Sequence, residues 1–257
     1  MSLLPMNITY IHHSSFLVET ASCMLLFDYT EGAIPALTGG KPLYVFASHV
    51  HHDHYDRKIF QTIPAAAGRA GVSRVTFVLS SDISRSDLPA KPHPEAVFLG
   101  PHETWEDDIL HVETLLSNDA GVAFVIAVHD GDESLYGDDH LKALKQIYFA
   151  GDLNAWNWDG DAEDMELIRV YHAELSRIDA MIFDVAFIPL DPRLGEEYTQ
   201  GITDFFDVCG CEARTVVPMH CWGKYEIIAQ AREKLADKYY ADRIAGYLKT
   251  GDVFTPV

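Results

Sequence analysis

The chain has 257 residues, and 48% of them are hydrophobic, which is enough for a packed core and excludes a disordered or fibrous protein. Its 39 Asp and Glu outnumber its 19 Lys and Arg. The resulting formal net charge of −20 disfavours nucleic acid and anionic membranes as partners. The longest unbroken apolar run, residues 122–128, is far shorter than the roughly 20 residues that cross a bilayer.

The amino terminus and the cysteines suggest the cellular compartment. The chain starts without the basic residues and apolar run of a signal peptide, so we expect a cytoplasmic protein. Four cysteines are too few for a disulfide framework and include no Cys-x-x-Cys pair, which predicts free thiols. The 13 histidines are roughly twice the number expected of an ordinary chain of this length, and this excess points to metal binding.

Short apolar runs rich in Val, Ile, Phe and Tyr dominate the first half of the chain and predict β-strands. In chain order these runs are Asn7–Ile11, Ser15–Glu19, Cys23–Phe27, Leu43–Ser48, Arg74–Ser80 and Ala96–Leu99. Two longer runs flank the turn-forming residues 117–120 and predict a β-hairpin over Ile109–Leu116 and Gly121–Val128. A further strand is expected at Gln146–Ala150.

The second half of the chain alternates helices with strands. Apolar residues recur with helical period over Asp161–Arg177 and Tyr225–Tyr240. Strands expected at Ala180–Ile188 and Arg214–Pro218 alternate with these helices and with the segment Glu196–Cys209. No Pro-rich or Ser-rich linker divides the chain. The pattern favours an α+β protein with two packed mixed β-sheets and outer helices, as a single domain over residues 1–257.

The negative charge is concentrated in one part of the chain. Residues 103–179 contain 19 Asp and Glu but four Lys and Arg. We expect most of this excess to lie on a solvated face, with an exposed turn at Gly131–Asp139.

A metal-binding pattern follows the predicted strand at Leu43–Ser48. The sequence there reads His-x-His-x-Asp-His. In an extended loop, residues two apart point the same way, so His49 and His51 can present their imidazoles to one ion. Asp53 and His54 can then turn toward a second ion a few ångström away. Because an apolar strand runs directly into the pattern and fixes its position, a dinuclear site is favoured over a histidine-rich surface loop.

The pattern resembles that of the metallo-β-lactamase superfamily, whose αββα fold carries this motif at the end of a strand. The resemblance covers most of the chain and implies an αββα sandwich with metal-dependent hydrolase activity. The opening Tyr10–Glu19, followed by Leu25–Asp28, looks like the lactonase and phosphodiesterase-like branch that includes ascorbate-phosphate lactonase.

Two later residues match further ligands of this superfamily. Asp152, in Ala-Gly-Asp after a strand, matches the aspartate that would bridge the two ions. His220, in Pro-Met-His after another strand, matches the final histidine ligand. Alone, each is weak evidence, because a strand-end Asp is often a turn former and a single His is often a core residue. Their order after the first motif favours the ligand interpretation.

The chain departs from the superfamily at one ligand. A loop of the Gly-His-Thr-x-Gly kind usually supplies a further histidine, and here the matching loop has Asn118 at that place. His111 and His129 lie at the open end of the predicted hairpin. They are roughly 20 Å from the turn at about 3.3 Å per residue, and they cannot easily reach the site.

Two explanations for the missing histidine are open. Either Asp119 supplies an oxygen ligand, or the first ion is held by water together with His49, His51 and Asp152. Zinc is the expected metal for two divalent ions, but an oxygen-rich first site also allows manganese or iron. A rival interpretation has one ion only, at the ligands Asp53, His54, Asp152 and His220.

Other residues are expected to support the centre. Asp28 could accept a hydrogen bond from a ligand histidine and so orient it, or it could simply form a turn. Asn118 is likewise placed behind the ligands. His13 could line the pocket or shuttle a proton, or belong to the core or surface. With Asp53 and Asp152, His13 completes the predicted catalytic set.

Three residues are candidates for binding substrate. Trp156 follows Asp152 closely and could form a wall of the pocket or only pack its loop. Arg193 could meet an anionic substrate group, with an ion pair to Asp191 as the alternative. Lys224, near His220, is a second cationic candidate, with surface exposure as its alternative.

These residues favour hydrolysis of a small ester, lactone or phosphoester. A water between two ions would be acidified, so that hydroxide is available near neutral pH, and the ions would polarise the attacked oxygen. A catalytically weak metal-binding or sensor module with one occupied site is the first alternative. A nucleic-acid-processing hydrolase is the second, and the negative charge counts against it. The oligomeric state is not predicted.

Overall fold

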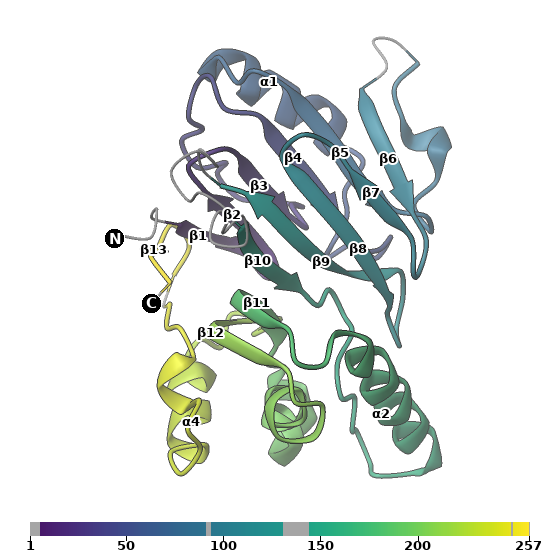
Figure 1. Ribbon diagram of the computed structural model, residues 1–257, viewed down its shortest axis with the longest axis vertical. Coiled ribbons are helices and arrows are strands. Elements are labelled where there is room, and N and C mark those ends of the chain that lie inside the picture. The colour runs from purple at the N-terminus through teal and green to yellow at the C-terminus, as the bar shows by residue number, and fades with distance from the viewer. Residues whose placement is uncertain (1–5, 91–93, 131–143, 248, 257) are drawn as a thin grey trace, which may run out of the picture.

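The computed structural model describes residues 6–90, 94–130, 144–247 and 249–256, which form two mixed β-sheets (Figure 1). The first sheet has the spatial order β13 (Val253–Phe254), β1 (Asn7–His12), β2 (Ser15–Glu19), β3 (Met24–Phe27), β4 (Leu43–Ala47), β5 (Val75–Ser80), β6 (Glu95–Leu99). The second has the order β12 (Glu212–Met219), β11 (Ile182–Pro189), β10 (Leu144–Phe149), β9 (Val122–His129), β8 (Leu110–Leu116), β7 (Thr104–Glu106). The predicted pair of mixed sheets is confirmed. The turn expected at Gly131–Asp139 lies outside the described residues.

Each sheet combines parallel and antiparallel strands. In the first sheet β1 and β2 form an antiparallel hairpin, and β3 to β6 are parallel. In the second, β7 to β10 are antiparallel and β10 to β12 are parallel. Parallel strands expose their carboxyl ends at one edge, so the loops after β10, β11 and β12 start side by side.

The core has two layers, because side chains alternate across each strand. Along β4, Tyr44 and Phe46 face the second sheet, whereas Leu43 and Val45 face the opposite side. Aromatic rings join the two sheets, since the rings of Phe46 and Phe124 lie 5.1 Å apart. This packing holds the sheet edges in fixed positions.

Helices cover the outer faces of the sheets (Figure 1). They are α1 (Ile59–Ala70), α2 (Ala162–Leu175), α3 (Gln200–Thr203) and α4 (Glu226–Lys234). Helix α1 was not predicted, because Pro64 lies inside it and proline disfavours a helix interior. It forms because Ile59, Phe60 and Ile63 are buried on the first sheet, each stabilising by roughly 1.5–3 kcal/mol.

Several predicted boundaries were wrong. Helix α4 ends at Lys234, before the predicted end at Tyr240. The segment Glu196–Cys209, to which no single element was assigned, contains the end of a 3₁₀ segment that starts at Pro192, then α3 and a π-helical turn. Strands β7 and β13 were missed because they are too short to show a period. Among the described residues, no helix combines the length and apolar character needed to cross a membrane.

Candidate metal centre

Side chains from five separate segments meet at the edge where β4, β10 and β12 end. They form two groups, and within each group the possible ligand atoms lie within 4.8 Å of one another. We call them the inner group, made of His13, Asp53, His54 and His220, and the outer group, made of His49, His51, Asp119 and Asp152. Every metal ligand predicted from the sequence belongs to one of the two groups.

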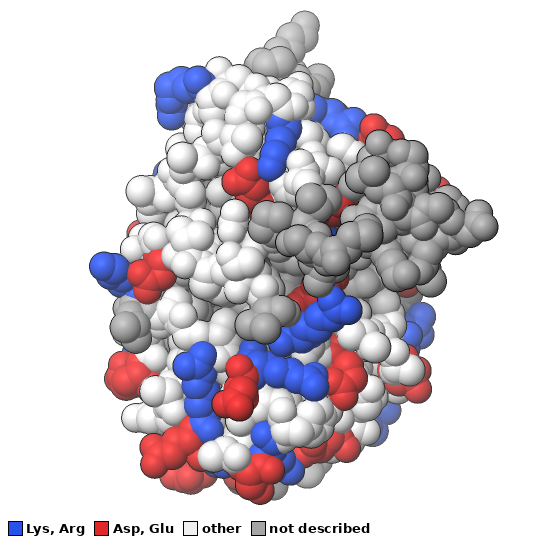
Figure 2. All heavy atoms as spheres, turned by 60° about the vertical axis from the view of Figure 1, so that its left-hand side comes forward, with Lys and Arg blue, Asp and Glu red and all other residues white. Residues whose placement is uncertain are grey.

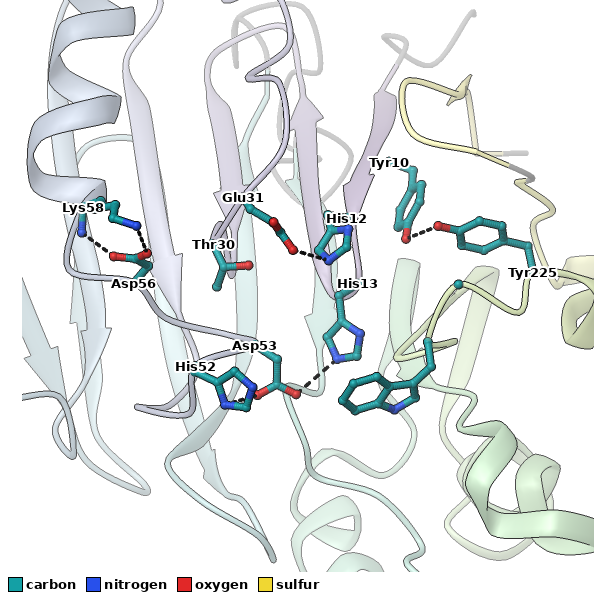
Figure 3. Close-up of a pocket in the computed structure, with 12 residues that line it drawn as sticks. Tyr10, His12, His13, Thr30, Glu31, His52, Asp53, Asp56, Lys58 and Tyr225 are labelled. Atoms are coloured by element: carbon teal, nitrogen blue, oxygen red, sulfur yellow. Dashed lines mark hydrogen bonds and ion pairs between the residues drawn. The ribbon is translucent and has the colours of Figure 1, made fainter.

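The inner group is arranged around the carboxylate of Asp53. Its Oδ2 lies 3.4 Å from Nε2 of His13, 3.8 Å from Nε2 of His220 and 4.0 Å from Nε2 of His54. Figure 3 shows His13 and Asp53 pointing toward each other from the β1–β2 turn and the loop after β4. The sequence suggested only a pocket-lining or proton-shuttling role for His13, whereas the structure also makes it a possible ligand.

Asp152 lies between the two groups. Its Oδ1 is 3.2 Å from Nε2 of His54 and 3.5 Å from Nε2 of His220, both in the inner group. Its Oδ2 is 3.6 Å from Nε2 of His49, in the outer group. One oxygen therefore faces each group, which is the arrangement that a bridging carboxylate requires.

The turn between β8 and β9 contributes to the outer group through Asp119. Its Oδ2 lies 3.5 Å from Nδ1 of His51. Asn118 points elsewhere, because its amide donates to the carbonyls of Asn154 at 2.7 Å and Leu167 at 2.8 Å. Asn118 thus ties the hairpin turn to the loop after Asp152, while Asp119 takes the place near the ligands.

The donor atoms of this centre fit a metal ion. The Nδ1 atoms of three imidazoles are engaged, at 2.7 Å from Asp28 for His54, 2.9 Å from Asp191 for His220 and 3.0 Å from Ser48 Oγ for His49. Among the buried atoms of the described residues that have no hydrogen-bond partner, five belong to this centre: the Nε2 of His13, His49, His54 and His220, and Oδ1 of Asp152. Unpaired buried polar atoms are costly, and a cation between these converging atoms would satisfy them together. Imidazole and carboxylate donors suit zinc, iron or manganese.

Asp28 supports the centre from behind. This fully buried carboxylate accepts hydrogen bonds from the backbone N–H of Ser48 at 2.8 Å and its hydroxyl at 2.6 Å, and lies 2.7 Å from Nδ1 of His54. It therefore fixes the start of the metal-binding loop and the ring orientation of His54. This is the orienting role suggested by its place at a strand end.

Two glycines let the neighbouring loops approach Ser48 closely. Gly121 has a φ of +65°, and a Cβ there would lie 2.1 Å from the carbonyl oxygen of Ser48 and 2.5 Å from Cβ of His49. Gly151 has a φ of +54°, and a Cβ there would lie 2.8 Å from Cβ of Ser48. Both positions require glycine for conformation and for space. They press the hairpin and the Asp152 loop against the His49 loop.

Asp191, which follows β11, organises the opposite side of the inner group. It is fully buried, and it accepts hydrogen bonds from the guanidinium of Arg193 and from the indole of Trp222, the latter at 3.2 Å. Burial alone would raise the pKa of Asp191, but the hydrogen bonds from His220 and Arg193 lower it to about 2. The structure thus places Arg193 in the ion pair that was the alternative to substrate binding.

A pocket of about 520 Å³ opens beside the inner group (Figure 3). It is lined by Tyr10, His12, His13, Thr30, Glu31, His52, Asp53, Asp56, Lys58, Trp222, Gly223 and Tyr225. None of the three predicted substrate-binding residues, Trp156, Arg193 and Lys224, lines it. Lys224 is exposed, and Trp156 is buried with its indole donating to the carbonyl of Asp152 at 2.9 Å.

The shifted pKa values of His49 and His54 are those expected of residues that bind a cation. Burial, helped by the neighbouring His54, lowers the pKa of His49 to about 3, so its imidazole is neutral as a metal ligand must be. Burial opposes a charge on His54, but Asp152 and Asp28 raise its pKa well above the ordinary value. A proton on His54 therefore offsets these carboxylates, and a bound cation would take over that role.

The fold itself is shared with solved structures. Residues along 98% of the chain superpose on 98% of Igni18, a metallo hydrolase from Ignicoccus hospitalis, with a TM-score of 0.61 and 17% identity. YhfI from Bacillus subtilis, a metallo-β-lactamase fold protein, matches 98% of this chain and 99% of its own with a TM-score of 0.59 and 14% identity. The chain has the metallo-β-lactamase fold.

One further solved structure shares the fold, and two hydrolases are similar in sequence. CmlA, a diiron β-hydroxylase from Streptomyces venezuelae, contains the same fold in 54% of its chain, with a TM-score of 0.53 and 12% identity. In sequence, a UPF0173 metal-dependent hydrolase of Pyrobaculum calidifontis is 29% identical over 96% of this chain and 99% of its own. A UPF0173 metal-dependent hydrolase of Desulforamulus reducens is 28% identical over 88% of each chain. No family model matches the chain.

Asp191 and Trp222 are parts of this metallo-β-lactamase-fold centre that the sequence interpretation missed. Asp191 was considered only as a partner for Arg193, although it follows β11 at the edge where the other ligands gather. Trp222 follows His220 by two positions and was not singled out. Their positions in the sequence could have indicated both residues, since each follows a strand of the sheet whose loops also carry Asp152 and His220.

Proposed function

We propose that this protein is a metal-dependent hydrolase that holds two divalent ions, one at each group, and acts on a small ester, lactone or phosphoester. The observation that carries the proposal is the set of buried, unpartnered Nε2 atoms around Asp152. Similarity to UPF0173 metal-dependent hydrolases over nearly the whole chain supports the same reaction class. The opening residues Tyr10–Glu19 favour the lactonase and phosphodiesterase-like branch.

Each polar residue has a defined task in this proposal. Bound ions would lower the pKa of a shared water and polarise the oxygen of the bond under attack. Asp152 spaces the two groups, because its oxygens face them separately. Asp53 holds the inner imidazoles together. His13 lines the pocket next to Asp53, and where Asp53, His54 and His220 hold the inner ion without it, its ring can pass a proton to the leaving group.

The ligand chemistry bears on which metal is used. Asp119 supplies a carboxylate where a further imidazole would make the site more selective for zinc. Carboxylate oxygen is a harder ligand and suits iron and manganese as well. CmlA, which is a diiron β-hydroxylase, contains this fold in 54% of its chain, and this keeps iron among the alternatives. Zinc is the metal we propose, with iron and manganese as alternatives.

Two other functions follow from particular observations. A sensor or metal-binding module with one ion is the alternative if the exposed outer group does not retain its metal. Nucleic-acid processing is disfavoured by the net charge of −20. On the face that Figure 2 shows, Lys and Arg side chains are interspersed with Asp and Glu and do not form a continuous basic surface.

The test is metal content together with hydrolysis. The chain is purified without chelator, reconstituted with zinc, manganese or iron, and assayed on a panel of aryl esters, lactones and aryl phosphoesters. We expect close to two equivalents of metal and hydrolysis that a chelator abolishes. A stoichiometry of one that His49→Ala does not change would favour the single-ion module. Tight binding of a DNA or RNA oligonucleotide at low salt would support the nucleic-acid alternative.

A further inference from the structure

The pocket beside the inner group shares two side chains with that group. His13 and Asp53 line the pocket and also belong to the inner group. Its volume of about 520 Å³ is in the range of small-molecule sites, which is about 300–1,000 Å³. A molecule in the pocket would therefore lie directly against the reacting centre. Its lining indicates what kind of molecule fits.

The charges of the lining do not suit an anion. Lys58 is the one Lys or Arg among the lining residues, and its ammonium lies 3.2 Å from the carboxylate of Asp56. Glu31 adds another carboxylate, 2.9 Å from the ring of His12 (Figure 3). The nearby Arg193 is already paired with Asp191. Where metal ions do not hold it, a phosphoryl group is held by unpaired guanidinium or ammonium groups.

The ligands of the centre reduce its attraction for anions further. Two divalent ions would bring four positive charges, and the carboxylates of Asp53, Asp119 and Asp152 would offset three of them. With a histidine in place of Asp119, the centre would be more positive by one charge. An acidic pocket beside a nearly neutral centre favours a substrate that carries no charge.

Trp222 supplies an apolar surface in this pocket. Its side chain is 42% exposed, although its indole N–H donates to buried Asp191 and the guanidinium of Arg193 lies 4.5 Å from its ring centre. Its ring lies 4.7 Å from that of His13. The tryptophan is therefore held in place from one side while it lines the pocket. A fixed, partly exposed indole can stack on a flat or apolar group.

We infer that the substrate is an uncharged carboxylic ester or lactone whose flat or apolar part lies against Trp222, and not a phosphoester. The inference rests on the proposed hydrolase function and selects among its substrate classes. Trp222 acts as a residue that determines specificity, and Lys58 serves to neutralise Asp56.

Binding tests the inference independently of catalysis. Acetophenone, an uncharged analogue of an aryl ester, and inorganic phosphate are titrated separately into the zinc-loaded protein and followed by NMR. We expect Trp222→Leu to weaken acetophenone binding about tenfold and Trp222→Phe, which keeps an aromatic ring, to weaken it less than about threefold. Lys58→Gln should change phosphate binding less than about threefold, because Lys58 is already neutralised.

Trp158 offers a matched control. It is 45% exposed and also lies under Arg193, with 5.5 Å between guanidinium and ring centre, but it does not line the pocket. Trp158→Leu should leave acetophenone affinity within about twofold of the original. Acetophenone affinity that is unchanged in Trp222→Leu, or phosphate affinity that falls more than about tenfold in Lys58→Gln, would overturn the inference.

Hydrolysis separates this inference from the function on which it rests. Phenyl acetate and phenyl phosphate are assayed with the same zinc-loaded proteins. Hydrolysis of phenyl acetate with a KM that rises about tenfold in Trp222→Leu supports both proposals. A higher kcat/KM for phenyl phosphate overturns the inference and leaves the hydrolase proposal standing. If neither is hydrolysed while acetophenone binding still depends on Trp222, the hydrolase proposal fails and the assigned binding surface stands.

Discussion

The inner and outer groups use the same residue types in different surroundings. In the inner group, the side chains of His54 and His220 are 0% and 2% exposed. In the outer group, those of His51 and Asp119 are 48% and 44% exposed, although His49 and Asp152 are buried. Water competes with a metal for these two outer ligands, whereas His54 and His220 have already lost most of their hydration.

The hydrogen-bond partners of the ligand histidines also favour the inner group. His54 and His220 each have Nδ1 within 2.9 Å of a fully buried carboxylate, supplied by Asp28 and Asp191 respectively. Such partners fix a ring and make it a stronger ligand. His51 faces an exposed carboxylate at 3.5 Å instead. Rigidity of the ligands, more than their number, should therefore decide which ion is held tightly, and the inner ion should be the tighter one.

The largest effect is expected from replacing Asp152, the residue that lies between the two groups. Asp152→Ala deletes the carboxylate oxygens that face both groups, so metal content should fall below one equivalent and hydrolysis should drop by more than about 1,000-fold. Elemental analysis and circular dichroism measure metal loss against retention of the fold. Full metal content in this variant would show that the bridge lies elsewhere.

A methyl group at Gly121 should damage the outer group selectively. Gly121→Ala places a Cβ against Ser48 and His49, and it should destabilise the fold by about 2–4 kcal/mol and reduce metal at the outer group. Gly210→Ala is the control, because Gly210 has nearly the same φ of +67° and nothing within 4 Å of a built Cβ. It should cost about 1 kcal/mol and leave metal content unchanged. Equal effects in thermal unfolding would mean that close packing on the His49 loop is unimportant.

Loss of charge behind His220 should weaken the inner group. Asp191→Asn removes the carboxylate that orients His220, and affinity for the tighter ion should fall about 10-fold to 100-fold. Asp184→Asn, on the strand β11 that precedes Asp191, is the control, since Asp184 pairs with Arg214 at 3.1 Å and belongs to neither group. Chelator competition measures both variants. If the looser ion is the one affected, the assignment of inner and outer affinity is reversed.

That these residues come together could be predicted because they follow strands. His49, His51, Asp53 and His54 lie within a stretch of six residues, and a buried strand fixes where the loop begins. Asp152 and His220 also follow strands, so the sheet brings them together. The two-sheet architecture could be predicted from the order of the apolar runs, because the pattern that marks a strand lies within the strand's own sequence.

Features that depend on distant contacts could not be predicted. The role of Asp191 depends on a hydrogen bond to a residue 29 positions away, and a single sequence does not encode that distance. Helix α1 forms because its apolar face meets a sheet, although Pro64 opposes it. His13 reaches the inner group because the β1–β2 turn gives it a φ of +46°, which its type does not predict.

The smallest effect is expected from replacing Asp119, and this substitution tests the outer group most directly. Asp119→Asn keeps the shape of the side chain but replaces a charged oxygen by a neutral one, which is a poorer ligand. Because the side chain is 44% exposed and its loop is held separately by Asn118, we expect the looser ion to bind about tenfold more weakly and the tighter one to be unchanged. Asp119→His should shift the preference of the outer group toward zinc.

Asp108→Asn, at a more exposed aspartate outside both groups, is the control and should change neither affinity. Stepwise metal release to a chelator resolves the two ions, and a single unchanged release curve for Asp119→Asn would mean that the outer ion is held without the hairpin turn.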